Sequence, residues 1–362
     1  MIINDKKTRE NTVDKRNANK RVGFYLILIV LMTAVLATAC GRQNEQAEPS
    51  VQAEASQQAE SAAPSAEADP AASTETASEA SGGEARSYTH EFGTTEVSGA
   101  PERIVGVYLD DFLLALGVKP LTQTMYGTRP LPYLQDQIGD LPAISTSSIN
   151  LELILQEKPE LILLAYPAYA QEGRYEQFAK IAPTYVFSGE DGWKDTLKKV
   201  ADVIGRPEQA EAWLNEYEDK TAKARESLKQ AIGDETVMFI RFTRAERIQI
   251  YGGPSNFSAD VLYGDLGLQP SKLIKEFAWG EDNSAPLISA EMIPDFDADH
   301  IFITYDKPGE DDAKEFQNHP LWKNVPAVQK GNLHEVEMFH WMNDGPIANS
   351  TKVDDVLKAL LK

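Results

Sequence analysis

Two glutamates occupy matching positions in two segments that lie 139 residues apart. Glu152 follows Asn150 by two positions, Glu291 follows Ser289 by two positions, and a short apolar run comes after each. Asn and Ser are preferred N-cap residues, so we expect each carboxylate in the first turn of a helix, where it complements the helix dipole. That role alone would explain either glutamate. The matched pair favours a second role, in which two exposed carboxylates bind two basic sites on a partner protein.

A second pair of similar segments indicates an internal duplication. Residues 116–120 read Leu-Gly-Val-Lys-Pro, and residues 266–270 read Leu-Gly-Leu-Gln-Pro. Both repeats occur in the same order along the chain and at similar offsets. We therefore interpret the chain as two lobes of common design.

The sole cysteine, Cys40, ends an N-terminal segment typical of secretion. Residues 6–21 are rich in Lys and Arg, residues 22–39 carry no charge, and small residues precede the cysteine. This order is typical of a lipoprotein signal, in which the thiol is diacylated and becomes the new N-terminus. We predict a signal peptide over residues 1–39 and lipidation at Cys40. A short signal anchor is the alternative.

An acidic segment rich in Ala, Ser and Glu follows the cysteine. Residues 41–87 contain no aromatic residue, Leu or Ile, and nine acidic residues against two arginines. Such a segment buries too little apolar surface to offset chain entropy, so we predict a disordered linker over residues 40–87. The folded part, residues 88–362, would then be tethered to the outer face of a cell membrane. The length of the linker favours the cell wall of a Gram-positive type of bacterium.

The composition and the motifs exclude several classes of function. The 362 residues hold 35 Lys and Arg against 56 Asp and Glu, and the net charge of −21 disfavours nucleic-acid binding. No nucleophile elbow, phosphate loop or dinucleotide fingerprint occurs, since Gly252-Gly253-Pro254-Ser255 lacks the Lys of a phosphate loop. The five histidines include no pair spaced for a zinc site. We therefore expect a binding protein and not an enzyme.

Strand-like and helix-like segments alternate through the folded part. The apolar runs that predict strands are 104–107, 161–164, 237–240 and 301–303. Helices are predicted over residues 110–116 and 151–157. This alternation favours an α/β fold with mainly parallel sheets.

The longest helical pattern lies between the two lobes. Residues 193–204 predict one helix, which ends at Gly205-Arg206-Pro207, and residues 208–232 predict a second helix with one apolar stripe. At 1.5 Å per residue the second helix is a rod of roughly 36 Å, which would limit lobe closure to a small rotation. The predicted parts are an N-terminal lobe (88–190), connecting helices (191–232) and a C-terminal lobe (233–362).

Six segments, in the same order, resemble siderophore-type substrate-binding lipoproteins of ABC importers, an iron-complex and cobalamin-like group. They are Pro-Glu-Arg-Ile-Val (101–105), Leu-Ala-Leu-Gly-Val-Lys-Pro (114–120), Asn-Leu-Glu-Leu-Ile-Leu-Gln-Glu-Lys-Pro-Glu-Leu-Ile (150–162), Ile-Ala-Pro-Thr (181–184), Ile-Ser-Ala-Glu-Met-Ile-Pro (288–294) and Pro-Leu-Trp-Lys-Asn-Val-Pro-Ala-Val (320–328). The resemblance implies two Rossmann-like lobes joined by a single long rigid helix, with a ligand cleft between them. It also implies delivery to an ABC permease, with Glu152 and Glu291 as the permease contacts. We expect a monomer.

The resemblance further implies a ferric siderophore as the ligand. Such a complex usually supplies the iron ligands itself, so the protein needs aromatic walls and arginines, and we expect no metal or cofactor bound directly by its side chains. An acidic chain with two well-placed arginines favours a hydroxamate complex. Ferric citrate, haem and cobalamin are alternatives within this fold, and His340 or a cleft tyrosine would then be the haem ligand. A non-transport interaction or sensor protein is the alternative outside it.

Candidate ligand-binding residues lie where predicted strands end, because open α/β sheets bind ligands at the carboxyl ends of their strands. The candidates are Tyr108, Tyr126, Arg129, Tyr166, Arg241, Trp279, Tyr305 and Trp341. Each aromatic candidate has an alternative role in the core. Arg241 is the strongest candidate, since an arginine that ends an apolar strand requires either a buried anion or access to solvent.

Overall fold

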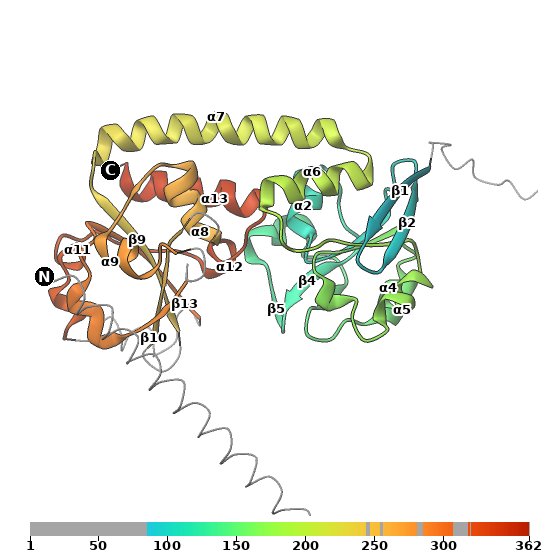
Figure 1. Cartoon of the computed structure of the whole chain (residues 1–362), viewed down its shortest axis with the longest axis horizontal. Helices are drawn as coiled ribbons and strands as arrows, with labels where there is room; N and C mark the ends of the chain where they lie inside the picture. The colour runs from blue at the N-terminus through green and yellow to red at the C-terminus, as the bar shows by residue number, and fades with distance from the viewer. Residues whose placement is uncertain are drawn as a thin grey trace, which may run out of the picture. The chain divides into compact units, whose positions relative to one another are not determined.

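The computed structural model describes residues 85–243, 247–253, 256–280, 285–306, 318 and 320–361 (Figure 1). These residues belong to one compact unit, Thr76–Lys362. The predicted signal peptide, the lipidation site Cys40 and most of the predicted linker lie outside the described residues. No helix within the described ranges is both long and apolar enough to cross a membrane.

The described chain begins with a hairpin that the sequence analysis does not predict. Strand β1 (Ala85–His90) starts within the range predicted for the linker and pairs antiparallel with β2 (Gly93–Ser98). Most residues of the hairpin are exposed or half-buried, so its sequence shows no apolar run. Residues 85–87 therefore belong to a strand, which corrects the predicted end of the linker at residue 87.

The N-terminal lobe contains two small sheets. One is fully parallel in the order β3-β7-β8, with β3 at Ile104–Val107, β7 at Leu161–Leu164 and β8 at Thr184–Val186. The other has the order β5-β4-β6, with β4 at Gln123–Tyr126, β5 at Arg129–Pro130 and β6 at Ala143–Ser145. Every residue of β3 and β7 is buried, which is why both strands read as unbroken apolar runs. The predicted strands 104–107 and 161–164 are confirmed.

Short helices surround these sheets. They are α2 (Asp110–Ala115), η1 (Pro132–Leu134), α3 (Gln135–Ile138), α4 (Leu151–Gln156), η2 (Pro167–Tyr169) and α5 (Arg174–Ala179). Helix α4 starts as predicted, because the side chain of Asn150 accepts hydrogen bonds from the backbone N–H groups of Glu152 (3.0 Å) and Leu153 (3.2 Å).

Two consecutive helices, α6 (Trp193–Ile204) and α7 (Pro207–Ile232), follow the N-terminal lobe. The break between them is the predicted one: Gly205 has φ 74°, and Pro207 takes the first position of α7. Figure 1 shows α7 running alongside α6 and α13 (Pro346–Leu360), and Lys220 of α7 donates to Asp354 of α13 at 2.8 Å. The 26 residues of α7 contain no Gly and no Pro after its first position, so it is a straight connection of about 39 Å.

The C-terminal lobe is built on one mixed sheet. Its strands are β9 (Thr236–Thr243), β10 (Arg247–Tyr251), β11 (Gln269–Pro270), β12 (Leu287–Ser289), β13 (His300–Tyr305) and β14 (Leu333–Glu335). The order is β12-β10-β9-β13-β14, with β11 also paired to β9. Strands β9, β11, β13 and β14 run parallel, whereas β10 and β12 form an antiparallel edge. The predicted α/β fold with mainly parallel sheets is confirmed, with this antiparallel edge added.

Helices of the C-terminal lobe are mostly short. They are α8 (Phe257–Ala259), the π-helical turn η3 (Asp260–Asp265), α9 (Lys272–Phe277), η4 (Ala290–Asp295), η5 (Trp322–Asn324), α11 (Pro326–Gln329), α12 (Met338–Trp341) and the longer α13.

Both repeated motifs fall at corresponding places in the two lobes. Gly117 and Gly267 each adopt a left-handed conformation, with φ 74° and 65°, directly before a turn into the next strand. Glu152 and Glu291 each occupy the first turn of a helix that precedes a buried parallel strand. The second helix is a 3-10 helix, since Pro294 inside it lacks the N–H that an α-helix would require.

Candidate functional site

Three predicted tyrosines come together on the N-terminal lobe. Tyr108 follows β3, Tyr126 ends β4 and Tyr166 follows β7. The ring of Tyr108 lies 5.1 Å from that of Tyr126 and 5.4 Å from that of Tyr166, both edge to face. Tyr169 extends the group, 6.0 Å from Tyr166. The ends of β3, β4 and β7 thus form one aromatic surface, as expected from their positions in the sequence.

Tyr108 is held in an uncommon backbone conformation. Its φ is 64°, in the left-handed region that costs a residue with a β-carbon about 1 kcal/mol or more. The Tyr108 N–H donates to the hydroxyl of Thr124 at 3.0 Å, and the Thr124 N–H donates to Asp110 Oδ1 at 3.1 Å. Strain that neighbouring hydrogen bonds maintain is typical of functional sites.

The tyrosines stay protonated. Burial raises the pKa of Tyr108 and Tyr126 far above the ordinary value, and that of Tyr169 to about 12. Neutral phenols can donate hydrogen bonds to ligand oxygens and offer apolar ring faces.

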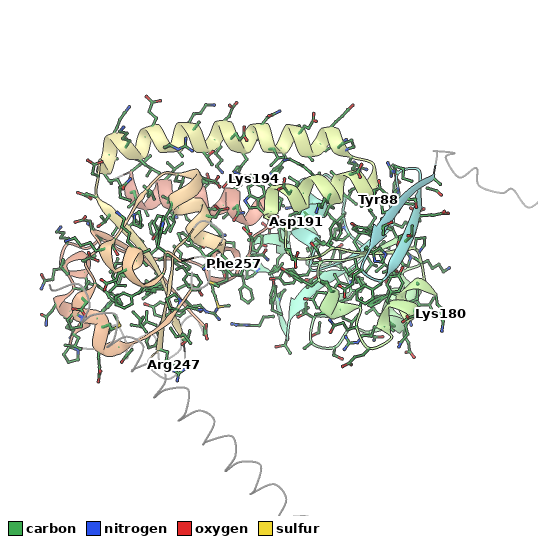
Figure 2. All side chains as sticks on the ribbon, viewed as in Figure 1. Tyr88, Lys180, Asp191, Lys194, Arg247 and Phe257 are labelled. Carbon is green, nitrogen blue, oxygen red and sulfur yellow. The ribbon has the colours of Figure 1, made fainter. Side chains whose placement is uncertain are left out.

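A small pocket lies between the two lobes and is lined by aromatic residues. Its walls include Tyr108, Tyr166 and Phe187 from the N-terminal lobe and Phe257 and Asp344 from the C-terminal lobe. Phe257, on α8, extends toward the N-terminal lobe (Figure 2). The free space is about 70 Å³. Phe257 and Asp344 are not predicted from the sequence, because neither follows an apolar strand.

The two predicted arginines, from different lobes, meet at one residue. Arg241 of β9 donates from Nε to Asp306 Oδ1 at 2.5 Å. Arg129 of β5 donates to the backbone carbonyl of Asp306 at 3.2 Å and lies 4.9 Å from the ring centre of Phe339. These contacts close the N-terminal lobe against α12 and the end of β13.

Trp341 is a core residue, which corrects its prediction as a ligand contact. Its side chain is fully buried between Phe239 and Phe302, each ring at 5.0 Å, and its Nε1 donates to Asp355 at 2.9 Å. Helix α12 covers the faces of β9 and β13, so an aromatic residue at its end points inward.

Two further predicted residues lie away from the pocket. Tyr305 is 3% exposed and packs against Phe242 in the core of the C-terminal lobe, which corrects its prediction as a ligand contact. Trp279 is 40% exposed and lies 5.4 Å from the ring of Tyr263, and it does not line the interlobe pocket of the described residues.

His340 cannot act as a free metal ligand in this structure. Its Nδ1 lies 2.9 Å from Glu337 and its Nε2 lies 2.6 Å from Asp355, so both ring nitrogens have partners. Although burial opposes the charged form, the hydrogen bonds to the two carboxylates raise the pKa of His340. The described residues contain no cluster of three potential metal ligands. Haem ligation by His340 would require this ion-paired group to come apart.

Both predicted docking glutamates are exposed at capped helix starts. Glu152 follows the Asn150 cap, and the N–H of Glu291 donates to the hydroxyl of Ser289 at 3.3 Å. Their positions match the predicted ones, and contact with a permease remains a prediction.

Asp110, which supports the Thr124–Tyr108 contact, makes stability depend on pH. Burial raises the pKa of Asp110 to about 7, and its Oδ2 is buried without a hydrogen-bond partner. The folded state therefore favours the protonated form, and the stability that this gives is fully present below about pH 4 and is lost as the pH rises through about 7.

The variant Asp110→Asn carries no charge at this position at any pH. Between about pH 5 and 8 we expect its free energy of unfolding to fall by a few kcal/mol less than that of the wild type does. Urea unfolding at both pH values measures the free energy of unfolding. An equal change between the two pH values in the variant and in the wild type would contradict the prediction.

The family comparison and two curated relatives agree with this geometry. The periplasmic binding protein family matches residues 110–337. Iron(3+)-hydroxamate-binding protein FhuD of Bacillus subtilis (strain 168) is 28% identical over 292 residues, 79% of this chain and 90% of that protein. The probable siderophore-binding lipoprotein YfiY of the same strain is 30% identical over 303 residues, with the same coverage of 79% and 90%.

Solved structures show the same fold. A FhuD fold-family component of a Fep/Fec-like ferrichrome ABC transporter from Bacillus subtilis superposes with a TM-score of 0.68 at 26% identity, covering 76% of this chain and all of that one. Staphylococcus aureus SirA complexed with staphyloferrin B gives a TM-score of 0.63 at 27% identity, covering 76% of this chain and 98% of that one.

Proposed function

The chain belongs to the periplasmic binding protein family, and on that premise we propose that it binds a ferric siderophore outside the cytoplasm and delivers it to an ABC permease. The observation that carries the proposal is an aromatic surface (Tyr108, Tyr126, Tyr166) in which Tyr126 pairs with Arg129, and Arg129 shares Asp306 with Arg241 at the junction of the lobes. Relatives named for siderophore binding and for ferrichrome transport support it.

A hydroxamate complex fits the chemistry of this junction best. Neutral phenols and a few N–H donors suit the oxygens of a ferric trihydroxamate, whose three anionic groups and Fe3+ sum to no net charge, and one relative is named for iron(3+)-hydroxamate binding. The siderophore would carry all of the iron coordination, so the protein would contribute hydrogen bonds and ring faces and no metal ligand.

The protein would act from the membrane surface. Lipidation of Cys40 would anchor it, and the acidic linker would give the folded part its reach; relatives are named as lipoproteins. Organisms with a single membrane and a thick wall suit this arrangement, and the unit would act as a monomer.

Ligand entry requires a local opening. The free space of about 70 Å³ is well below the ~300–1,000 Å³ typical of ligand sites. Tyr166 and Phe257 are 39% and 38% exposed, so their rings can turn outward without exposing the core. A small separation of the lobes beside α7 would provide the remaining space.

Tryptophan fluorescence tests the proposal, because Trp193 lines the pocket. We expect saturable quenching of the purified folded part by ferrichrome or ferrioxamine B, and none by the iron-free siderophores at the same concentrations. Ferric citrate, a ferric catecholate, haem and cobalamin complete the panel. Trp193→Phe should remove most of the signal while isothermal titration still detects binding. No response to any member of the panel, by either method, would reject the receptor function.

A further inference from the structure

The Asp306 carboxylate neutralises the positive charge of Arg241, the strongest ligand-binding candidate. The Asp306 carboxylate lies 2.5 Å from Arg241 Nε, and both side chains are about one-quarter exposed. Burial opposes the charge of Arg241, but hydrogen bonds with Tyr251 and with Asp306 raise its pKa above the ordinary value. Arg241 is therefore a cation whose charge is already balanced before any ligand arrives.

The second arginine also contacts this residue. Arg129 donates to the Asp306 carbonyl at 3.2 Å and places its guanidinium over Phe339. The contact links β5 of one lobe to the end of β13 in the other. It fixes the backbone of Asp306 and so keeps the carboxylate in place against Arg241.

The interlobe pocket is also unfavourable to anions. The described residues that line it include Asp191 and Asp344 and no lysine or arginine. The negative charge of Asp344 contributes, after burial, to the raised pKa of Tyr166. An anionic ligand that entered this pocket would meet two carboxylates.

We propose that Asp306 is a specificity-determining residue that occupies Arg241 and thereby selects neutral hydroxamate complexes over ferric complexes with free carboxylates. This inference rests on the proposed function and specifies its substrate class. A carboxylate ligand that bound the remaining N–H groups of Arg241 would lie beside the Asp306 carboxylate, a like-charge arrangement that disfavours the wrong ligand. An oxygen of an uncharged ferric hydroxamate complex can accept from the remaining N–H groups of Arg241, because a guanidinium carries five donors.

Replacement of Asp306 by its neutral isostere tests the proposal. Purified wild type, Asp306→Asn and the control Asp219→Asn, an exposed position on α7, are titrated with ferrichrome and with ferric citrate. We expect Asp306→Asn to bind ferric citrate at least about tenfold more tightly than the wild type does, and ferrichrome within about twofold. The gain for ferric citrate should shrink at high salt, and the control should match the wild type for both ligands. Asp306→Ser, which also removes the charge, should give the same gain and guards against a folding defect in a single variant.

The outcomes separate this inference from the proposed function. If the wild type bound ferrichrome but neither folded variant bound ferric citrate more tightly than the wild type, the inference alone would be overturned. Tighter binding of ferric citrate than of ferrichrome by the wild type would overturn it as well. If the wild type bound no member of the siderophore panel, the proposed function would fall, and this inference with it.

Discussion

Asp111→Ala is expected to lower the free energy of unfolding by about 2–4 kcal/mol, because it removes a buried carboxylate that joins the two lobes. Asp111 lies on α2 of the N-terminal lobe, yet its oxygens accept from the N–H groups of Ile347 (2.7 Å) and Ala348 (3.0 Å), in the first turn of α13. The hydroxyl of Tyr133 donates to it at 2.9 Å. The substitution leaves these three donors without their acceptor. Urea unfolding followed by circular dichroism at neutral pH measures the loss.

Two companion variants test the origin of that loss. A β-carbon on Gly345 would lie 2.2 Å from the Asp111 carboxyl carbon, so Gly345→Ala should destabilise the protein through the same contact. Asp140→Asn changes an exposed aspartate of the N-terminal lobe that pairs with Lys119, and it should leave the unfolding midpoint unchanged. A wild-type midpoint for Asp111→Ala would show that the link between α2 and α13 contributes nothing to stability.

Replacing Glu152 and Glu291 together by Ala is expected to abolish siderophore uptake and leave the dissociation constant unchanged. Both side chains are exposed in the first turns of capped helices, one in each lobe, and the variant removes the two carboxylates predicted to contact permease arginines. Uptake of radioactive iron by cells that carry the permease is measured beside ligand titration of the purified variant.

The matched control replaces one exposed glutamate in each lobe outside these motifs, Glu176 and Glu276. This pair should retain both uptake and binding. Normal uptake by the Glu152/Glu291 variant would exclude a docking role for the pair. A parallel loss of ligand binding would indicate that the two glutamates support the fold instead.

The strands and the connecting helices could be predicted because each is determined by residues within its own segment of the chain. Strands β3 and β7 are buried on both faces and therefore appear as continuous apolar runs. Gly205 and Pro207 separate α6 from α7 by their own backbone preferences. The hairpin β1–β2 lacks such a signal, because few of its residues are buried.

The candidate site was predicted only in part, because a residue's surroundings depend on distant segments. Tyr108 and Tyr166 follow β3 and β7, which pair in one parallel sheet, so their convergence could be inferred. Trp341 has an equally suitable residue type, but α12 folds over the sheet and buries it. The pairing of Arg241 with Asp306 joins positions 65 residues apart and is visible only once β9 and β13 are side by side.

The straight helix α7 has a consequence for how a transporter could recognise a loaded receptor. A continuous helix resists bending, so filling the site would change the spacing of surface features on the two lobes by little. A permease whose contacts depended only on this spacing would bind empty and loaded molecules almost equally well. The permease would then have to distinguish loaded from empty receptor by surfaces near the ligand itself, or by the rate at which each form dissociates from it.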